Sequence, residues 1–163
     1  MFKRGIYRCL FFSVVISMIL VCGTAAAAVV YKLRTGTTFQ EGCVAPCMCP
    51  VMGNMDVIGT FRLVEKSVDP LFTRYRLRKI SWTVVAPEGE VVHRITGYGR
   101  YRIGGEFALL QQLILIISID GSEPMLLDSG LVPVESTFPA ISISVDRGTQ
   151  CYDIWIDIKA SPR

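Results

Sequence analysis

Short apolar stretches separated by Gly, Pro and Asp follow one another along the chain from residue 30 to its end. Apolar and polar residues alternate in most of them, and no long stretch has the 3.6-residue period of a helix, so the pattern predicts β-strands. Turn dipeptides at Glu88-Gly89, Gly104-Gly105 and Asp120-Gly121 join consecutive strands as hairpins. We therefore expect an all-β fold, a single antiparallel β-barrel or β-sandwich of about eight strands.

The strands predicted from this pattern cover 30–38, 57–66, 72–85, 91–103, 107–119, 124–129, 140–145 and 151–159. The run 107–119 is apolar on both faces, which places it in the middle of the sheet rather than at an edge. In the last strand Ile154, Ile156 and Ile158 are expected on the inner face, with Asp153 and Asp157 on the outer face.

The alternation changes phase within 72–85, because Leu77 is odd-numbered whereas Ile80 is even-numbered. One extra residue near Arg78-Lys79, a β-bulge, restores a single apolar face. The pairs that follow from a hairpin with 91–103 are Trp82 with Ile95, Tyr75 with Tyr101, Arg76 with Arg100 and Arg74 with Arg102.

Arg74, Arg76, Arg100 and Arg102 share the outer face in this register, and like charges directly opposed destabilise a sheet by about 0.2–1 kcal/mol per pair. Neutralisation by acidic side chains is one explanation, with Glu106 reaching Arg102 and Asp153 or Asp157 serving the others; plain solvation is another. An anionic ligand or surface is the alternative, which makes these four arginines a candidate anion-facing patch.

The first thirty residues have a different composition. Lys3, Arg4 and Arg8 precede an apolar run over 9–22, and "GTAAAA" follows it. This order is typical of a secretory signal peptide, residues 1–28, cleaved near Ala26 to Ala28. Residues 9–30 are also long enough to span a bilayer as a retained anchor. In both cases the remainder is exported, to a secreted or periplasmic location, and membrane association is expected only through an uncleaved N-terminal segment.

The net charge and the domain division refer to the chain without the N-terminal segment 1–28. The 17 basic residues fall to 14 without Lys3, Arg4 and Arg8, which equals the 14 acidic residues. The exported part is therefore neutral overall, and its net charge indicates no nucleic-acid partner. We divide this part into the first strand with a Cys/Met-rich loop, 29–56, and an antiparallel β domain, 57–163.

Four cysteines remain after the signal, Cys43, Cys47, Cys49 and Cys151. An even number in an oxidising compartment favours two disulfides. Cys47 and Cys49 are too close in sequence to pair without strain. Two arrangements are left, Cys43–Cys47 with Cys49–Cys151 or Cys43–Cys49 with Cys47–Cys151. Either bridge to Cys151 closes a ring of about 100 residues and contributes about 4–5 kcal/mol.

The same loop supports a second hypothesis, a soft-metal site for copper or zinc, because thiolate and thioether sulfurs bind these ions. The candidate ligands are Cys47, Met48, Cys49, Met52 and Met55. Methionine also fills protein cores without any metal role.

Four stretches, "GCVAPCMCPV", "GTFRL", "YRIGGEFALLQQL" and "DSGLVP", resemble a group of uncharacterised bacterial secreted proteins. Those proteins carry a similar cysteine- and proline-containing segment ahead of a β-rich domain. The resemblance covers most of the chain after the signal and implies export and a β-rich fold. It implies no activity.

Catalytic motifs are not evident. His93 is the only histidine, and the register directs it inward beside Val84, as for a structural histidine. No GxSxG motif or phosphate-binding glycine loop occurs. We therefore expect a non-enzymatic binding or structural module of the cell envelope without a cofactor. The alternatives are the soft-metal protein and a carrier that encloses a small apolar ligand in its barrel.

Overall fold

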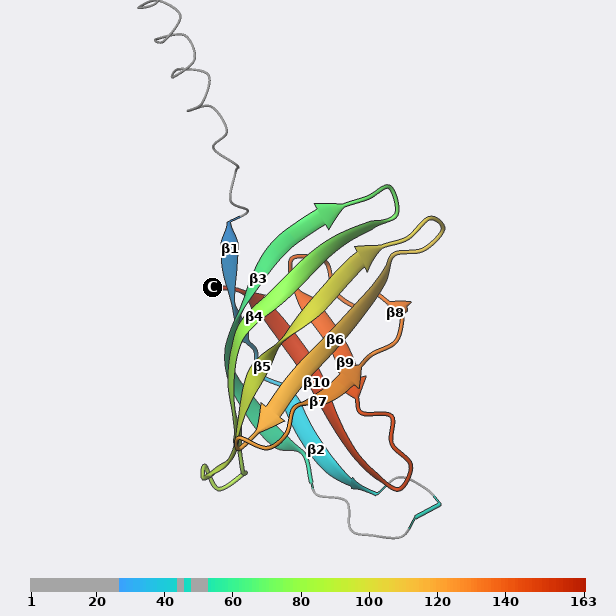
Figure 1. Cartoon of the computed structure of the whole chain (residues 1–163). Helices are drawn as coiled ribbons and strands as arrows, with labels where there is room; N and C mark the ends of the chain where they lie inside the picture. The colour runs from blue at the N-terminus through green and yellow to red at the C-terminus, as the bar shows by residue number, and fades with distance from the viewer. Residues whose placement is uncertain (1–26, 44–45, 48–52) are drawn as a thin grey trace, which may run out of the picture.

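The computed structural model describes residues 27–43, 46–47 and 53–163. Residues 1–26 of the expected signal peptide, with Met48, Cys49 and Met52, lie outside the described residues. The strands are β1 (Ala28–Leu33), β2 (Thr38–Cys43), β3 (Met55–Val68), β4 (Phe72–Val85), β5 (Val91–Gly104), β6 (Leu110–Ile119), β7 (Met125–Asp128), β8 (Val132–Pro133), β9 (Ile141–Asp146) and β10 (Tyr152–Pro162) (Figure 1). The all-β prediction is confirmed. None of the described residues forms a helix of the length and apolar character needed to cross a membrane.

Hydrogen bonding closes eight strands into a ring, in the order β10, β2, β3, β4, β5, β6, β7, β9 and back to β10. Each pairing is antiparallel, so the ring is an antiparallel barrel. Its two ends are named here by their loops. The tip end carries the β3–β4 and β5–β6 turns, and the loop end carries the β4–β5 turn and the segment between β2 and β3 (Figure 1).

The first strand is interrupted where the sequence predicts a continuous one over 30–38. Strands β1 and β2 run in the same direction between β10 and β3, with β1 nearer the tip end. The chain turns between them, and the Thr37 amide donates to the Arg34 carbonyl at 3.1 Å. The Thr37 hydroxyl then accepts from the Lys159 amide at 3.1 Å and donates to the Lys159 carbonyl at 2.9 Å. A side chain therefore replaces the missing backbone partner of β10 at this break.

Strand β4 has the predicted bulge between Leu77 and Ile80, and Lys79 within it adopts a left-handed φ of 53°. The extra residue keeps both apolar side chains inside, where Leu77 is 2% and Ile80 3% exposed. The register with β5 is the predicted one, with Trp82 opposite Ile95 and Tyr75 opposite Tyr101.

Glycines permit two close backbone approaches where the barrel wall bends. At Gly59, with φ +144°, a Cβ atom would lie 2.2 Å from the Ser81 carbonyl oxygen. At Gly97 it would lie 2.3 Å from the Ile116 carbonyl oxygen. Both contacts are far shorter than a carbon and an oxygen tolerate, so these positions require glycine.

Aromatic side chains fill the barrel at the tip end. The ring centroids of Tyr75, Tyr101 and Phe138 lie 5.5–6.4 Å apart. The Tyr101 hydroxyl donates to Oε1 of the buried Gln111 at 3.1 Å, and the Gln111 amide donates to the Ser142 carbonyl at 2.8 Å. Burial raises the pKa of Tyr101 above its ordinary value. The interior at this end is occupied by protein side chains.

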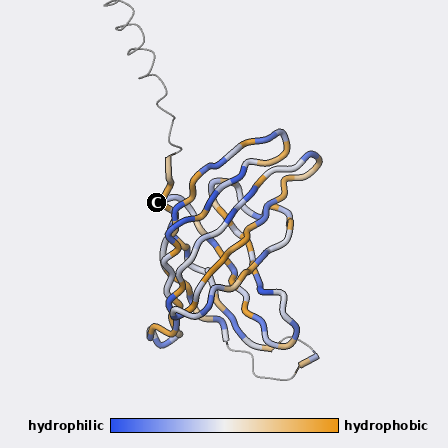
Figure 2. The backbone as a smooth tube through the Cα atoms, viewed as in Figure 1, coloured by the Kyte–Doolittle hydropathy of each residue, from blue (hydrophilic) through white to orange (hydrophobic). Residues whose placement is uncertain are grey.

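Two expected strands differ in their details. Strand β6 lies in the middle of the sheet as predicted and is apolar over most of its length (Figure 2), but it begins at Leu110. Residues 107–109 belong to the turn instead, and Phe107 is 96% exposed. Asp153, expected on the outer face, is only 7% exposed, and its carboxylate accepts hydrogen bonds from the Ile154 amide at 2.7 Å and the Arg147 amide at 3.2 Å.

Candidate functional site

An open groove of about 970 Å³ crosses the outer face of β4, β5 and β6, and we call it the arginine groove. Its basic lining residues are Lys66, Arg74, Arg76, Arg78, Arg100 and Arg102. None of the described residues that line it carries a carboxylate. Positive charge is therefore concentrated here, although the chain beyond residue 28 has equal numbers of basic and acidic residues.

Cross-strand pairing produces this concentration. Arg74 lies opposite Arg102 and Arg76 opposite Arg100, as predicted from the sequence. The inward direction of Tyr75 and Leu77 sends these arginines outward, because successive side chains of a strand point to opposite faces. On the other side of β4, Arg78 lies opposite Arg62 of β3. The four predicted arginines thus share one surface, and the structure adds Arg78 and Lys66 to them.

The predicted acidic partners do not neutralise the groove. Asp153 and Asp157 lie on β10, and two strands, β2 and β3, lie between β10 and β4 in the ring. The expectation that these two carboxylates neutralise the groove arginines was therefore wrong. Within the described part of the chain, Asp69 in the β3–β4 turn is the only carboxylate that makes an ion pair with a groove arginine, namely Arg74. Glu106 makes no ion pair with Arg102 there. Arg76, Arg78 and Arg100 make no ion pair with any other described residue.

Arg102 carries an unused hydrogen-bond donor. Its Cζ atom lies 5.0 Å from the centroid of the Phe72 ring, a cation–π contact that fixes the guanidinium over the aromatic face. Its Nε atom is buried and has no hydrogen-bond partner among the described residues. A buried donor without an acceptor costs about 1–3 kcal/mol. Such a group in a native protein is commonly explained by a bound ion or water.

The groove continues from the arginines onto apolar and aromatic residues. Tyr98, Ile114, Ile116 and Leu126 line this part, and the first and last of them are 57% and 54% exposed. The groove thus joins a cationic half to an apolar half. Both kinds of contact are therefore open to a ligand that carries an anionic group beside an apolar one.

Acidic residues gather beyond the border of the groove. Gln112 marks this border, since its amide donates to both carboxylate oxygens of Asp128 at 2.8 and 3.1 Å. Asp128 lies opposite Asp146, near Asp153. Burial raises the pKa of Asp146, and the negative charge of Asp153 raises it further. Asp128, Asp146 and Asp153 therefore lie outside the lining of the arginine groove.

The predicted disulfide region lies at the loop end. Cys47 is bonded to Cys151 at the start of β10, with the Cα atoms 5.1 Å apart. This bond excludes the arrangement that pairs Cys43 with Cys47. Cys43 is itself disulfide-bonded, and Cys49, its partner in the second arrangement, lies outside the described residues. The bridge ties the N-terminal half of the barrel to its last strand.

The proposed soft-metal ligands are only partly described. Cys47 is held in the disulfide and so is not a thiolate, and Met55 lies opposite Phe39 with 6% exposure in the barrel interior. No group of three or more His, Cys, Asp or Glu in the described ranges could hold a metal ion. Met48, Cys49 and Met52 lie outside these ranges.

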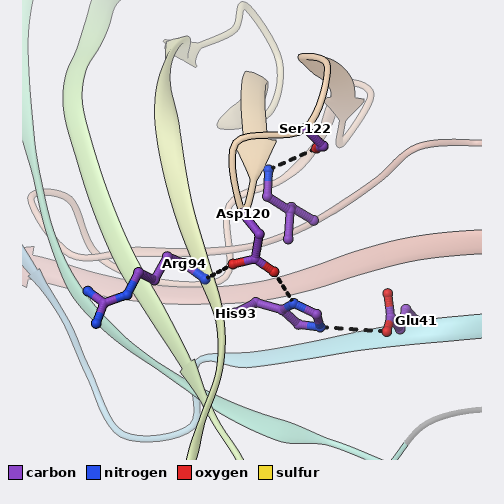
Figure 3. Close-up of polar contacts among 6 residues, drawn as sticks. Glu41, His93, Arg94, Asp120 and Ser122 are labelled. Atoms are coloured by element: carbon purple, nitrogen blue, oxygen red, sulfur yellow. Dashed lines mark hydrogen bonds and ion pairs between the residues drawn. The ribbon is translucent and has the colours of Figure 1, made fainter.

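His93 lies at the loop end of the barrel, between Asp120 and Glu41 (Figure 3). Its Nδ1 lies 2.7 Å from Asp120 Oδ2, and its Nε2 lies 3.7 Å from Glu41 Oε1. Its ring is 5.6 Å from that of Phe39. The hydrogen bond from His93 and a second one from the Arg94 amide hold the pKa of Asp120 below its usual value. Because β2 and β5 are not neighbours in the ring, the contact with Glu41 spans the barrel mouth.

This cluster resembles a catalytic dyad in composition but not in arrangement. The hydroxyl of Ser122, in the same turn as Asp120, bonds to backbone groups, accepting from the Ile119 amide at 3.3 Å (Figure 3). The second ring nitrogen of His93 faces another carboxylate, where a nucleophile would be needed. The arrangement fits the structural role expected for this histidine. Sequence reasoning missed Glu41 and Asp120 as its partners, although the Asp120-Gly121 turn was recognised.

Comparison with models of known protein families, with curated proteins and with solved structures found no match to this chain. The resemblance to bacterial secreted proteins therefore stays a prediction.

Proposed function

We propose that this chain is exported and acts as a non-enzymatic binding module of the cell envelope, with an anionic ligand held in the arginine groove. The observation that carries the proposal is the set of six basic side chains on one groove without a lining carboxylate. Export is supported by the Cys47–Cys151 disulfide and by the basic and apolar pattern of residues 1–28.

Arginine is suited to ligands with several oxygen atoms. Its planar guanidinium donates two parallel hydrogen bonds to phosphate or carboxylate oxygens. Arg76 and Arg100 face each other across neighbouring strands, so one oxyanion between them can accept from both. We therefore expect a ligand with a phosphate or sulfate group.

The carrier and metal alternatives receive less support. Tyr75, Tyr101 and Phe138 occupy the barrel at the tip end, and His93 with Phe39 occupies it at the loop end, so an apolar ligand would have to displace packed side chains. Among the proposed metal ligands, the sulfur of Cys47 is already bonded to Cys151. The arginine groove instead gathers six basic side chains on one surface, and among them only Arg74 makes an ion pair with another described residue.

The test is calorimetric titration with inorganic tripolyphosphate at low ionic strength. Wild type is compared with R76Q/R100Q, and with K32Q/R147Q as a control that removes two positive charges elsewhere on the surface. Hydrogen bonds to charged groups contribute about 1.5–3 kcal/mol each, so the groove variant is expected to bind at least about tenfold more weakly. An equal loss in both double variants, or no binding by wild type, would refute the proposal.

A further inference from the structure

Exposed apolar side chains gather on the two turns at the tip end of the barrel. Val68 at the end of β3 and Leu71 in the β3–β4 turn are 66% and 48% exposed, and Phe107 and Leu109 in the β5–β6 turn are 96% and 56% exposed. Leaving four large apolar side chains in water is unfavourable, and such clusters mark interaction surfaces. We call these four residues the tip rim.

The two turns form one continuous and well-ordered surface. The Gly105 amide donates to the Leu71 carbonyl at 2.8 Å, which links the β5–β6 turn to the β3–β4 turn. Asp69 Oδ1 accepts from the amides of Leu71 and Phe72 at 3.0 and 2.9 Å, which holds the β3–β4 turn in shape. The tip rim is thus presented by hydrogen-bonded turns, so little ordering is needed before it binds.

The N-terminal apolar segment joins the barrel at the same end. Ala28 pairs with Val64, four residues before Val68, and β1 runs antiparallel to β3, so β1 begins on the side of the barrel nearer the tip rim. Figure 1 shows β1 beginning at the end where the β3–β4 and β5–β6 turns project. The apolar run 9–22 ends six residues before Ala28, a span of at most about 20 Å. A bilayer that received this run would face the tip rim.

Basic residues lie directly behind the rim. Arg74 is three residues from Leu71, or about 10 Å along the strand, and its partner Arg102 is two residues from the end of β5. The polar layer of each leaflet is about 5–7 Å thick, so side chains at this depth reach phosphate groups when the rim enters the acyl boundary. Glu106 and Asp69 are the acidic residues of the two turns, and Asp69 is neutralised by Arg74.

From these observations we propose that the tip rim is a membrane-docking surface. Val68, Leu71, Phe107 and Leu109 enter the outer boundary of the bilayer that receives the N-terminal segment, and Arg102 contacts anionic phospholipid headgroups. The barrel is then held upright on the membrane by its own surface and not by its N-terminal segment alone. The part of the arginine groove nearer the loop end remains open to solvent in this orientation.

The experiment places a tryptophan on the rim of the full chain, reconstituted in vesicles of phosphatidylcholine and phosphatidylglycerol. F107W is compared with V91W, which adds the same probe at a 53% exposed site at the loop end. Emission of the two native tryptophans is subtracted with wild type. With phospholipids brominated near the top of the acyl chain, F107W is expected to lose most of its added emission and V91W almost none.

Three results would overturn the proposal. Equal emission of F107W in brominated and ordinary lipid would show that the rim does not enter the bilayer. Emission that instead depends on protein concentration would identify a second copy of the chain as the occupant. Quenching that is unchanged in pure phosphatidylcholine would show that Arg102 does not contact anionic headgroups. Tripolyphosphate titration needs no lipid, so the arginine groove can fail or succeed separately.

Discussion

Substitution of Arg100 tests whether the clustered arginines of the groove destabilise the folded protein, as expected if they are kept for ligand binding. Arg100 lies opposite Arg76, a directly opposed pair that destabilises the sheet by about 0.2–1 kcal/mol. Arg74 and Arg102 lie one alternate position away on the same face, and unit charges at the spacing of such diagonal neighbours, about 7–8 Å, repel in water by about 0.5 kcal/mol each. R100Q should therefore raise the free energy of unfolding by about 1–2 kcal/mol at low salt.

The change in the free energy of unfolding is measured with urea, because urea is uncharged and does not itself alter the ionic strength. The measurement is made once at 10 mM and once at 1 M sodium chloride. The Debye length falls to about 3 Å at 1 M, so the gain should nearly vanish there. K32Q is the matched control, because Lys32 is an exposed strand residue that lies opposite Ser161 and Thr60 rather than another cation. A destabilised R100Q, or a gain that survives 1 M salt, would refute the electrostatic reasoning.

Three further predictions concern the barrel itself. C47A/C151A opens a ring with a sequence separation of 104 residues and should lower the free energy of unfolding by about 4–5 kcal/mol in urea; a loss below about 1 kcal/mol would contradict this role. G59A places a methyl group against the Ser81 carbonyl and should cost about 2–4 kcal/mol, whereas G53A, with open space around it, should stay within about 0.5 kcal/mol; equal thermal shifts would argue against the close approach. Burial raises the pKa of Tyr31 to about 12, so the stability that depends on its neutral form is complete below pH 10 and is lost as pH rises toward 12, by about 1.4 kcal/mol per pH unit. Y31F should lack this loss. If the free energies of unfolding of Y31F and wild type fall equally with pH between pH 10 and 12, Tyr31 is not the group responsible.

The β4–β5 hairpin shows what the sequence could predict. Its bulge at 78–79 and its register follow from local information, namely the phase of the apolar residues and the Glu88-Gly89 turn. The register also predicts the pairs Arg74–Arg102 and Arg76–Arg100, since one cross-strand pair determines the others. Four residues of the candidate groove were therefore accessible without a structure.

Other features depend on segments far apart in the chain. Asp153 was expected outside, but the chain folds back between β9 and β10, and backbone amides capture its carboxylate. The Glu41–His93 contact crosses the barrel mouth, which no pairwise strand alternation can indicate. Residues 107–109 continue an apolar run, yet they form the exposed rim because the strand starts only at Leu110. Periodicity describes faces of strands and does not tell where a strand leaves the sheet.

The closing seam of the barrel sets the order in which the chain can fold. Strand β10 pairs with β1 and β2, which come from the other terminus of the described chain, and the disulfide bond joins the same regions. These are the contacts of greatest sequence separation, and such contacts form slowly because a long loop must be ordered first. If the chain is exported as we propose, its last residues arrive on the outer side last, so the ring cannot close until translocation is complete.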